Sequence, residues 1–146
     1  MNLKISTHEG VLFKGAISKI TVPTYAWEIT VLPWHQPLSS VVKAGVLSFE
    51  TSESLNSDEY TIKDNKVIMS ISKGIILIDG ETVVITTSLA TSSPSESEEV
   101  LLQMKKDMEA ELEKIRDDGN AEELEMALEN MEKIEADIKL SKLGKI

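Results

Sequence analysis

The chain has 146 residues, 41% of them hydrophobic, which suits one domain with a buried core, or one domain with an appendage. It carries a formal net charge of −10 and contains no cysteine. The lack of cysteine excludes disulfides and thiolate chemistry, and the acidic balance argues against binding to nucleic acid or anionic lipid. Residues 1–10 have no signal-peptide pattern, and no apolar run approaches the roughly 20 residues of a membrane-spanning helix.

Up to about Thr87 the apolar residues recur with a period of two, and β-branched side chains are frequent. Two dipeptides, Asp64–Asn65 and Asp79–Gly80, lie between such runs and suit tight hairpin turns. Because no helical pattern separates the runs, we expect residues 1–87 to form an all-β sandwich or barrel of about ten strands. The runs are LKIS, GVLF, ISKITV, EITVL, GVLSFE, EYTIK, KVIMSI, GIILI and TVVITT.

Residues 88–97, SLATSSPSES, have the composition of a linker, because they are small, hydroxylic and interrupted by a proline. Either Ser95 or Ser97 can cap a helix that follows, and the glutamates after them favour its positive end. We therefore expect the β domain to end before this linker and a helical segment to begin after it.

From residue 98 the apolar period is helical, and Gly119 interrupts it as a natural C-cap. Two amphipathic segments joined by so short a turn fold back on each other. We expect an antiparallel hairpin over residues 98–146, with helices at about 98–116 and 121–142. Helices of this length are marginal alone, so their stripes must bury one another or a partner. The expected hairpin core is Leu101, Met104, Met108, Leu112, Ile115, Leu124, Leu128, Met131 and Ile138, and the second stripe also includes Ile134, or Glu135 by a strict heptad.

The negative charge is concentrated in the hairpin. Residues 95–146 carry 16 acidic and 8 basic side chains, a net charge of −8, whereas residues 1–94 carry 9 and 7, a net charge of −2. Within residues 121–138, seven acidic side chains accompany a single basic one, Lys133. We interpret this run as a solvated helix face.

Residues 29–40, ITVLPWHQPLSS, gather rare residue types in a chain with only two histidines and two tryptophans. Pro33 and Pro37 restrict the backbone, which predicts a stiff, extended corner. His35 has no partner at metal-ligand spacing, so we interpret it as a hydrogen-bonded structural residue or a contact to a partner. Trp34 is interpreted as packing or as an interface anchor. No Ser-His-Asp set or phosphate-binding loop occurs, and we assign no catalytic, cofactor-binding or metal residue.

Several spaced motifs within residues 3–50 agree with the pattern of one family: a Glu-Gly turn, a VPT strand end, an EIT-x-LP-x-H-x-PL corner and a GVL strand. With them, the chain closely resembles the epsilon subunit of F-type ATP synthases. The order of strands, linker and hairpin agrees as well, although residues 51–146 match in pattern more than in identity. The matching residues are Glu9–Gly10, Val22–Pro23–Thr24, Glu28–Ile29–Thr30, Leu32–Pro33, His35, Pro37–Leu38 and Gly45–Val46–Leu47.

The resemblance implies a non-catalytic rotor subunit in the central stalk of a proton- or ion-translocating ATP synthase. In this family the sandwich lies against the gamma subunit and the c-ring and helps to pass torque between them, and the hairpin can rise along gamma and restrain ATP hydrolysis. The implied partners are therefore gamma and the c-ring, and the catalytic alpha and beta subunits through the hairpin, with no nucleic acid. The membrane is reached only through the complex, at the cytoplasmic face of a bacterial plasma membrane or in an organelle. The candidate c-ring contacts are Glu28, Trp34 and His35.

Three departures from the family pattern bear on mechanism. Trp27 stands where a turn glycine is usual, so the turn differs locally or Trp27 is an added anchor. The Asp-x-x-Arg-Ala pattern with which some bacterial members bind ATP is absent, and Arg116 is the only arginine, so we expect no nucleotide cofactor. In other members, basic residues on the second helix approach an acidic segment of a catalytic subunit, and residues 121–138 of this chain are mostly acidic instead. We therefore expect the hairpin to inhibit ATP hydrolysis more weakly or through different contacts.

Two alternatives stand beside this prediction. One is a stand-alone adaptor whose hairpin binds a partner coiled coil, and the other is a small β-sandwich hydrolase. The hydrolase would need convergent polar residues that two histidines and one arginine hardly supply.

Overall fold

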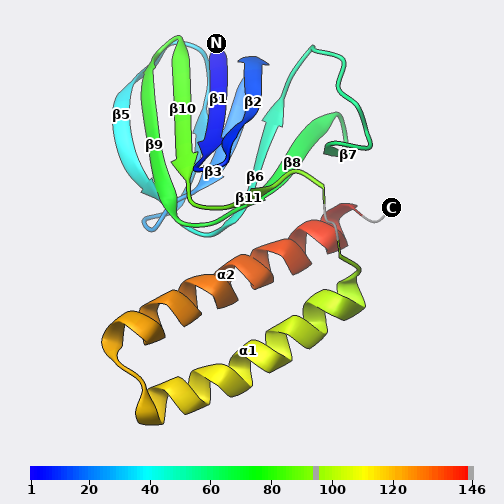
Figure 1. Ribbon diagram of the computed structural model, residues 1–146. Coiled ribbons are helices and arrows are strands. Elements are labelled where there is room, and N and C mark those ends of the chain that lie inside the picture. Colours follow the sequence, from blue (N-terminus) through cyan, green and yellow to red (C-terminus); the bar gives the residue numbers. More distant parts are fainter. Residues whose placement is uncertain (94–95, 145–146) are drawn as a thin grey trace.

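The computed structural model describes residues 1–93 and 96–144, which form two layers of β-sheet followed by two helices (Figure 1). The expected fold class, an all-β sandwich followed by a two-helix hairpin, is confirmed, with eleven strands in the described residues. The elements are β1 (Asn2–Thr7), β2 (Gly10–Ala16), β3 (Lys19–Pro23), β4 (Glu28–Val31), β5 (His35–Val42), β6 (Gly45–Glu50), β7 (Thr61–Lys63), β8 (Lys66–Ile71), β9 (Gly74–Gly80), β10 (Thr82–Thr87), β11 (Ala90–Thr91), α1 (Glu98–Asp118) and α2 (Ala121–Gly144).

Two sheets face each other across the core. The five-stranded sheet has the order β2-β1-β10-β9-β5, and the six-stranded sheet has the order β11-β8-β6-β3-β4, with β7 paired to β8. Neighbouring strands are antiparallel except β1 and β10, which run parallel with Asn2 opposite Thr82. The first and last long strands of the sandwich therefore lie side by side in the middle of one sheet.

The core follows from the two-residue period of the strands. Alternate side chains point inward, so that Leu3 and Ile5 of β1 are buried with Ile76 of β9. Phe13 and Phe49 bring an aromatic contact between the two sheets, with ring centroids 4.5 Å apart. This apolar layer gives the strands a fixed framework from which exposed side chains can be presented.

One of the two predicted turns is confirmed, and the other lies one residue further along. Asp64 and Asn65, between β7 and β8, have φ angles of 52° and 62°. Asp79 pairs with Thr82, so the second turn consists of Gly80, which has a φ angle of 56°, and Glu81. Two-residue hairpin turns need such positive φ values, which Asn, Asp and Gly adopt more readily than other residues.

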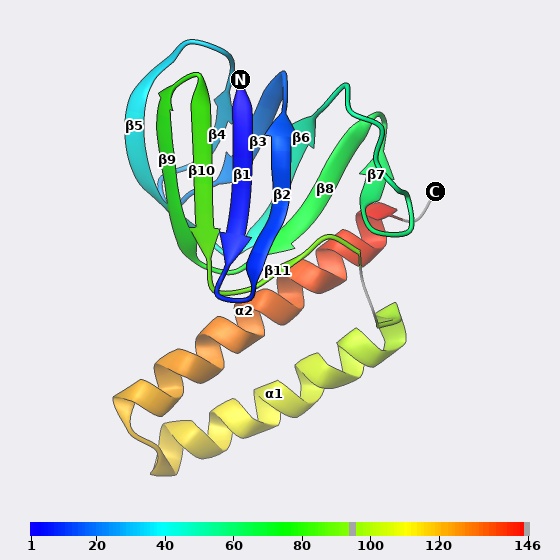
Figure 2. The ribbon, with the colours of Figure 1, turned by 45° about the horizontal axis from the view of Figure 1, so that its top comes forward.

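The two helices lie beneath the sandwich, with α2 between the sandwich and α1 in both views (Figures 1 and 2). α2 contacts β6, β7 and β8 of the six-stranded sheet. Ser97 is the N-cap of α1 and accepts a hydrogen bond from the Val100 amide, whereas Ser95, the other candidate cap, lies outside the described residues. Residues 145–146 of the expected hairpin segment also lie outside them. Strand β11 falls inside residues 88–97, which we expected to be a linker.

Candidate docking surfaces

The proline corner forms a tight turn between β4 and β5. The His35 amide donates to the Leu32 carbonyl over 3.2 Å, which places Pro33 and Trp34 at the two central positions. Pro33 fixes its own φ, and Trp34 takes a φ of 68°, a left-handed conformation that costs an aromatic residue roughly 1–3 kcal/mol. The Trp34 amide donates to the Gly80 carbonyl over 3.2 Å, which ties the corner to the β9–β10 turn.

The side chains of this corner have different environments. Trp34 is 75% exposed and stands out from the sandwich, with Leu32 also exposed beside it. His35 is half-buried, and its Nδ1 lies 2.7 Å from the Gln36 carbonyl. The corner therefore presents an aromatic surface, held in place by local hydrogen bonds, and its histidine is engaged with backbone.

Glu28, the third candidate c-ring contact, lies apart from Trp34 and His35. It begins β4, and the corner follows the other end of that strand. Glu28 lines an open groove of about 370 Å³ together with Lys139 and Leu143 of α2. The structure thus brings Trp34 and His35 together and places Glu28 beside the C-terminal part of the hairpin.

A second exposed apolar surface lies on the outer side of the five-stranded sheet, and we call it the strand face. It consists of Val41 on β5 with Ile75 and Leu77 on β9, which are 46%, 52% and 51% exposed. Val41 lies directly opposite Ile75, and Leu77 lies two residues further along the same side of β9. Sequence reasoning did not single out these residues. Their signal is the unbroken apolar run GIILI, because a strand that is apolar on both sides predicts cover on both sides.

The hairpin core is narrower than predicted. Leu101, Ile134 and Ile138 form a buried cluster, and Met108 packs against it. Met131 is also buried, while Leu112, Ile115 and Leu124 are half-buried. Met104 and Leu128 are 41% and 44% exposed, so their assignment to the core is wrong. The reason is helical phase, since these two side chains lie at the margins of the contact between α1 and α2.

Sequence reasoning also missed a second buried side of α2, which faces the six-stranded sheet. It includes Ala136, Leu140 and the charged pair Lys133 and Asp137. Lys133 is only 7% exposed, although the sequence pattern placed it on a solvated face. Buried side chains on two sides of one helix predict two neighbours, and α2 contacts both α1 and the sandwich.

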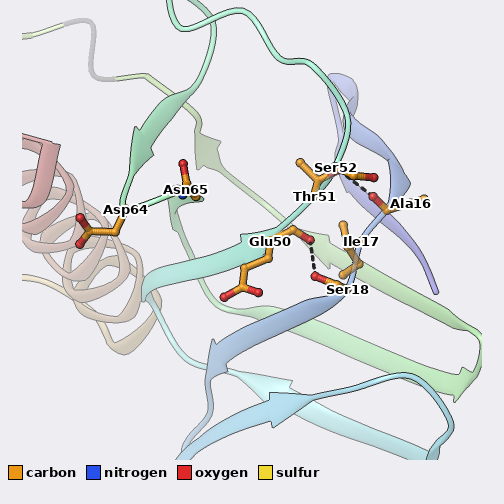
Figure 3. A pocket seen from close by; sticks show the side chains of 8 residues that line it. All are labelled: Ala16, Ile17, Ser18, Glu50, Thr51, Ser52, Asp64 and Asn65. Carbon is orange, nitrogen blue, oxygen red and sulfur yellow. Dashed lines mark hydrogen bonds between the residues drawn. The ribbon is translucent and has the colours of Figure 1, made fainter.

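The sandwich also contains a polar groove of about 560 Å³ between the β2–β3 and β7–β8 turns (Figure 3). Its walls are joined by hydrogen bonds, from the Ser18 amide to the Glu50 carbonyl over 2.9 Å and from Thr51 Oγ1 to the Ala16 carbonyl over 2.7 Å. The Asp64 carboxylate points away from Ile17 and Ser18 (Figure 3). The residues that line the groove include two carboxylates, Glu50 and Asp64, and no histidine.

Residues 1–93 and 96–144 contain no group of three or more His, Asp or Glu side chains placed to hold a metal ion. Neither described helix is long and apolar enough to cross a membrane.

A rigid sandwich with exposed apolar and aromatic surfaces, and a helical hairpin packed on one sheet, defines a docking module of a larger assembly. Residues 1–93 match the family described as ATP synthase, Delta/Epsilon chain, beta-sandwich domain. The chain therefore belongs to this family, which confirms the predicted resemblance. Its members are non-catalytic subunits of the ATP synthase complex.

Relatives extend the similarity into the hairpin. The ATP synthase epsilon chain of Neisseria meningitidis serogroup C / serotype 2a is 24% identical over 128 residues, covering 88% of this chain and 85% of that protein. The ATP synthase epsilon chain of Nitratiruptor sp. is 31% identical over 80 residues, covering 55% of this chain and 61% of that protein.

Solved structures show the same fold. A chain of the Euglena gracilis mitochondrial ATP synthase, from a structure of OSCP, F1 and c-ring, superposes with a TM-score of 0.69 at 18% identity, over 92% of this chain and 76% of that one. A chain of the Tetrahymena thermophila mitochondrial ATP synthase central stalk and c-ring superposes with a TM-score of 0.51 at 14% identity, over 63% and 66%.

Proposed function

We propose that this chain is a rotor subunit in the central stalk of an F-type ATP synthase, where its sandwich joins the c-ring to the gamma subunit. Membership of the family indicates that the chain is part of an ATP synthase complex. The observation that supports the role as a rotor subunit is the presence of two separate exposed surfaces on one sandwich. A part that transmits torque must hold two partners at once, and the shared apolar core between the surfaces keeps their spacing fixed.

The strand face is our candidate for the gamma subunit. Its three aliphatic side chains lie on the edge strand β5 and on the neighbouring strand β9. Burying such a surface against another subunit removes apolar area from water and so favours association. Each side chain that becomes buried contributes roughly 1 kcal/mol or more to association. The proline corner, with Trp34 exposed and His35 fixed to backbone, is our candidate for the c-ring loops. Glu28 contributes to a c-ring contact only if that contact extends along β4 from the corner.

The same family membership makes the chain part of a membrane-associated complex. We place it at the cytoplasmic face of a bacterial plasma membrane, with an organellar membrane as the alternative, on the strength of bacterial relatives such as that of Nitratiruptor. The chain meets the membrane only through its partners in this proposal.

We also propose that the hairpin binds no ATP. Arg116, the one arginine, lies in the last turn of α1 and is exposed, far along the helix from the residues that follow the Ser97 cap. A triphosphate is held best by several convergent cations, which α1 does not offer near its start. Titration calorimetry with MgATP should show no binding at millimolar concentration, and a stoichiometric heat would contradict the proposal.

The decisive experiment is reconstitution with the gamma subunit. The full chain should form a 1:1 complex, and Ile75→Lys on the strand face should weaken it at least about tenfold, because a charge would be placed where an apolar contact forms. Val11→Lys is the matched control, since Val11 is 53% exposed on β2 at the opposite edge of the same sheet. Absence of a complex with wild-type chain would overturn the proposed function. Equal weakening by both variants would remove the strand face as the gamma site.

A further inference from the structure

A buried polar cluster joins the hairpin to the sandwich, and we call it the latch. It consists of Lys133 and Asp137 on α2, Ser70 on β8 and Thr91 on β11. Lys133 Nζ lies 2.5 Å from Asp137 Oδ1 and donates to Thr91 Oγ1 over 2.9 Å and to Ser70 Oγ over 3.4 Å. Ser70 Oγ in turn donates to Asp137 Oδ1. Lys133 and Ser70 are almost entirely buried, and the ammonium group has three partners for its three protons.

The two charges of the latch belong to the same helix. Lys133 and Asp137 are four residues apart, so the ion pair forms within one turn of α2. The sandwich contributes only the neutral hydroxyls of Ser70 and Thr91. If the hairpin separates from the sandwich, the ion pair stays intact on α2. The hydroxyls of Ser70 and Thr91 then form hydrogen bonds with water in place of Lys133 and Asp137. Separation therefore leaves no unpaired buried charge on either part.

We propose that the latch is a release device, which fixes the position of α2 on the sandwich and keeps the docking weak enough to be reversed. A buried ion pair costs desolvation, and well-packed apolar residues in its place are often neutral or stabilising. Apolar contact alone, through Leu140, Ala136 and the buried Ile68 of β8, would permit several positions along the helix. The hydroxyl partners select one position, because their hydrogen bonds form at a single register. The meaning of this release in the complex rests on the proposed function of the chain as a rotor subunit.

Docking can be measured on the full chain alone, because the chain has no native cysteine. A Cβ atom at Gly144, the last residue of α2, would lie 3.0 Å from Cγ2 of Thr61 on β7. The pair Thr61→Cys with Gly144→Cys is therefore placed to form a disulfide only when the hairpin is docked. Its equilibrium constant in a glutathione redox buffer reports the effective concentration of one thiol at the other, and this concentration falls as docking weakens.

Four latch variants are compared on this reporter background. Ser70→Ala should lower the effective concentration about tenfold and Thr91→Val about fivefold, because each removes one partner of a buried charge. Asp137→Asn should lower it by about 100-fold or more, since Lys133 would be left buried without a counter-charge. The variant that replaces the whole latch by apolar side chains, Lys133→Met, Asp137→Leu, Ser70→Ala and Thr91→Val together, leaves no buried hydroxyl unpaired and should match or exceed the wild type. Lys105→Gln is the control, because Lys105 pairs with Glu135 over 3.8 Å at an exposed site between the helices.

The apolar variant at all four latch positions is the decisive one. If it loses docking as severely as Asp137→Asn, the polar contacts of the latch are the main attraction between hairpin and sandwich, and the proposal of a release device is wrong. Unchanged docking in Ser70→Ala and Thr91→Val would likewise overturn it, and Thr91→Val keeps the test open should Ser70→Ala not fold, because Thr91 lies on the short edge strand β11. The measurement needs neither gamma nor the c-ring, so a failed reconstitution would not affect its outcome.

Discussion

Thr24 and Trp27 are joined by hydrogen bonds across the turn between β3 and β4. The Thr24 amide donates to the Trp27 carbonyl over 3.1 Å, and the Trp27 amide donates to Thr24 Oγ1 over 3.2 Å. Thr24 Oγ1 also donates to the Trp27 carbonyl. Backbone and side chain of Thr24 therefore close the turn, while the Trp27 ring remains 72% exposed. This geometry explains how the turn forms with a tryptophan in place of a glycine.

Replacing Thr24 by valine tests this closure. Thr24→Val keeps the shape of the buried side chain but leaves the Trp27 amide without its acceptor, so the free energy of unfolding should fall by about 1–3 kcal/mol. Thr24→Ser retains the hydroxyl and should stay within about 1 kcal/mol of the wild type. Urea unfolding followed by tryptophan fluorescence measures both, and equal midpoints for wild type and Thr24→Val would show that the hydroxyl is dispensable.

Substitutions at Trp34 should affect binding to the c-ring without lowering the stability of the sandwich. Glycine adopts a φ of 68° without strain but adds entropy to the unfolded chain, so Trp34→Gly should leave the free energy of unfolding unchanged or raise it by up to about 1 kcal/mol. The same variant should reduce binding to the c-ring, because it removes the most exposed aromatic side chain of the corner. Trp34→Phe should retain much of that binding. A Trp34→Gly chain that unfolds more easily than wild type would mean that the ring stabilises the sandwich itself.

The sandwich is expected to lose stability at alkaline pH through Tyr60. Burial, with a smaller contribution from the negative charge of Glu59, raises the pKa of the Tyr60 hydroxyl above its ordinary value of 10.0. The hydroxyl donates to the Leu12 carbonyl over 2.8 Å, which also favours the neutral form. Since the folded state has the higher pKa, this stabilisation is complete below pH 10 and is lost as the pH rises through the folded-state pKa.

Tyr60→Phe isolates that contribution. The variant should lose about 1 kcal/mol at pH 7, because the hydrogen bond to Leu12 is gone, and its stability should fall less steeply than that of the wild type above pH 10. Stability curves from pH 7 to about pH 11 measure both effects. Tyr25→Phe controls for removal of a hydroxyl at an exposed position. Parallel curves for wild type and Tyr60→Phe would exclude Tyr60 as the alkaline titrating group.

Deletion of residues 95–146 should change ATP hydrolysis by the assembled complex by less than about twofold. The second helix presents exposed glutamates, and Lys133, the only basic residue in residues 121–138, is buried against the sandwich. A helix of this charge is repelled by acidic segments of other subunits within about a Debye length, roughly 8 Å at physiological salt. ATPase assays of complexes with full-length and truncated chain measure the effect. A large rise in rate after truncation would show that the hairpin inhibits despite its charge.

The sandwich could be predicted from the sequence because its determinants are local. The alternating pattern of a strand such as TVVITT and a turn dipeptide such as Asp64–Asn65 each predict the local structure without reference to the rest of the chain. The latch could not be predicted, because Lys133 and Asp137 have the sequence pattern of any solvated helix pair. Only the crossing of α2 over β8 buries them, and that crossing depends on residues 63 positions apart in sequence.

The same limit applies to the docking surfaces. Family pattern drew attention to Glu28, Trp34 and His35 as a group, yet the extended length of β4 separates Glu28 from the other two. The strand face depends on the register that sets Val41 opposite Ile75, which no short stretch of sequence contains. Met104 and Leu128 are exposed because they lie at the margins of the contact between α1 and α2, and a heptad count does not show how wide that contact is.

The parallel pairing of β1 with β10 also orders events during synthesis. Asn2 finds its partner Thr82 only after most of the sandwich has been made, so the middle of the five-stranded sheet closes late and across a long loop. Until then, β1 can pair only with β2, and the six-stranded sheet that receives α2 lacks a completed opposite layer. The hairpin follows the sandwich in the chain, so the strands that receive α2 are synthesised before α2 itself.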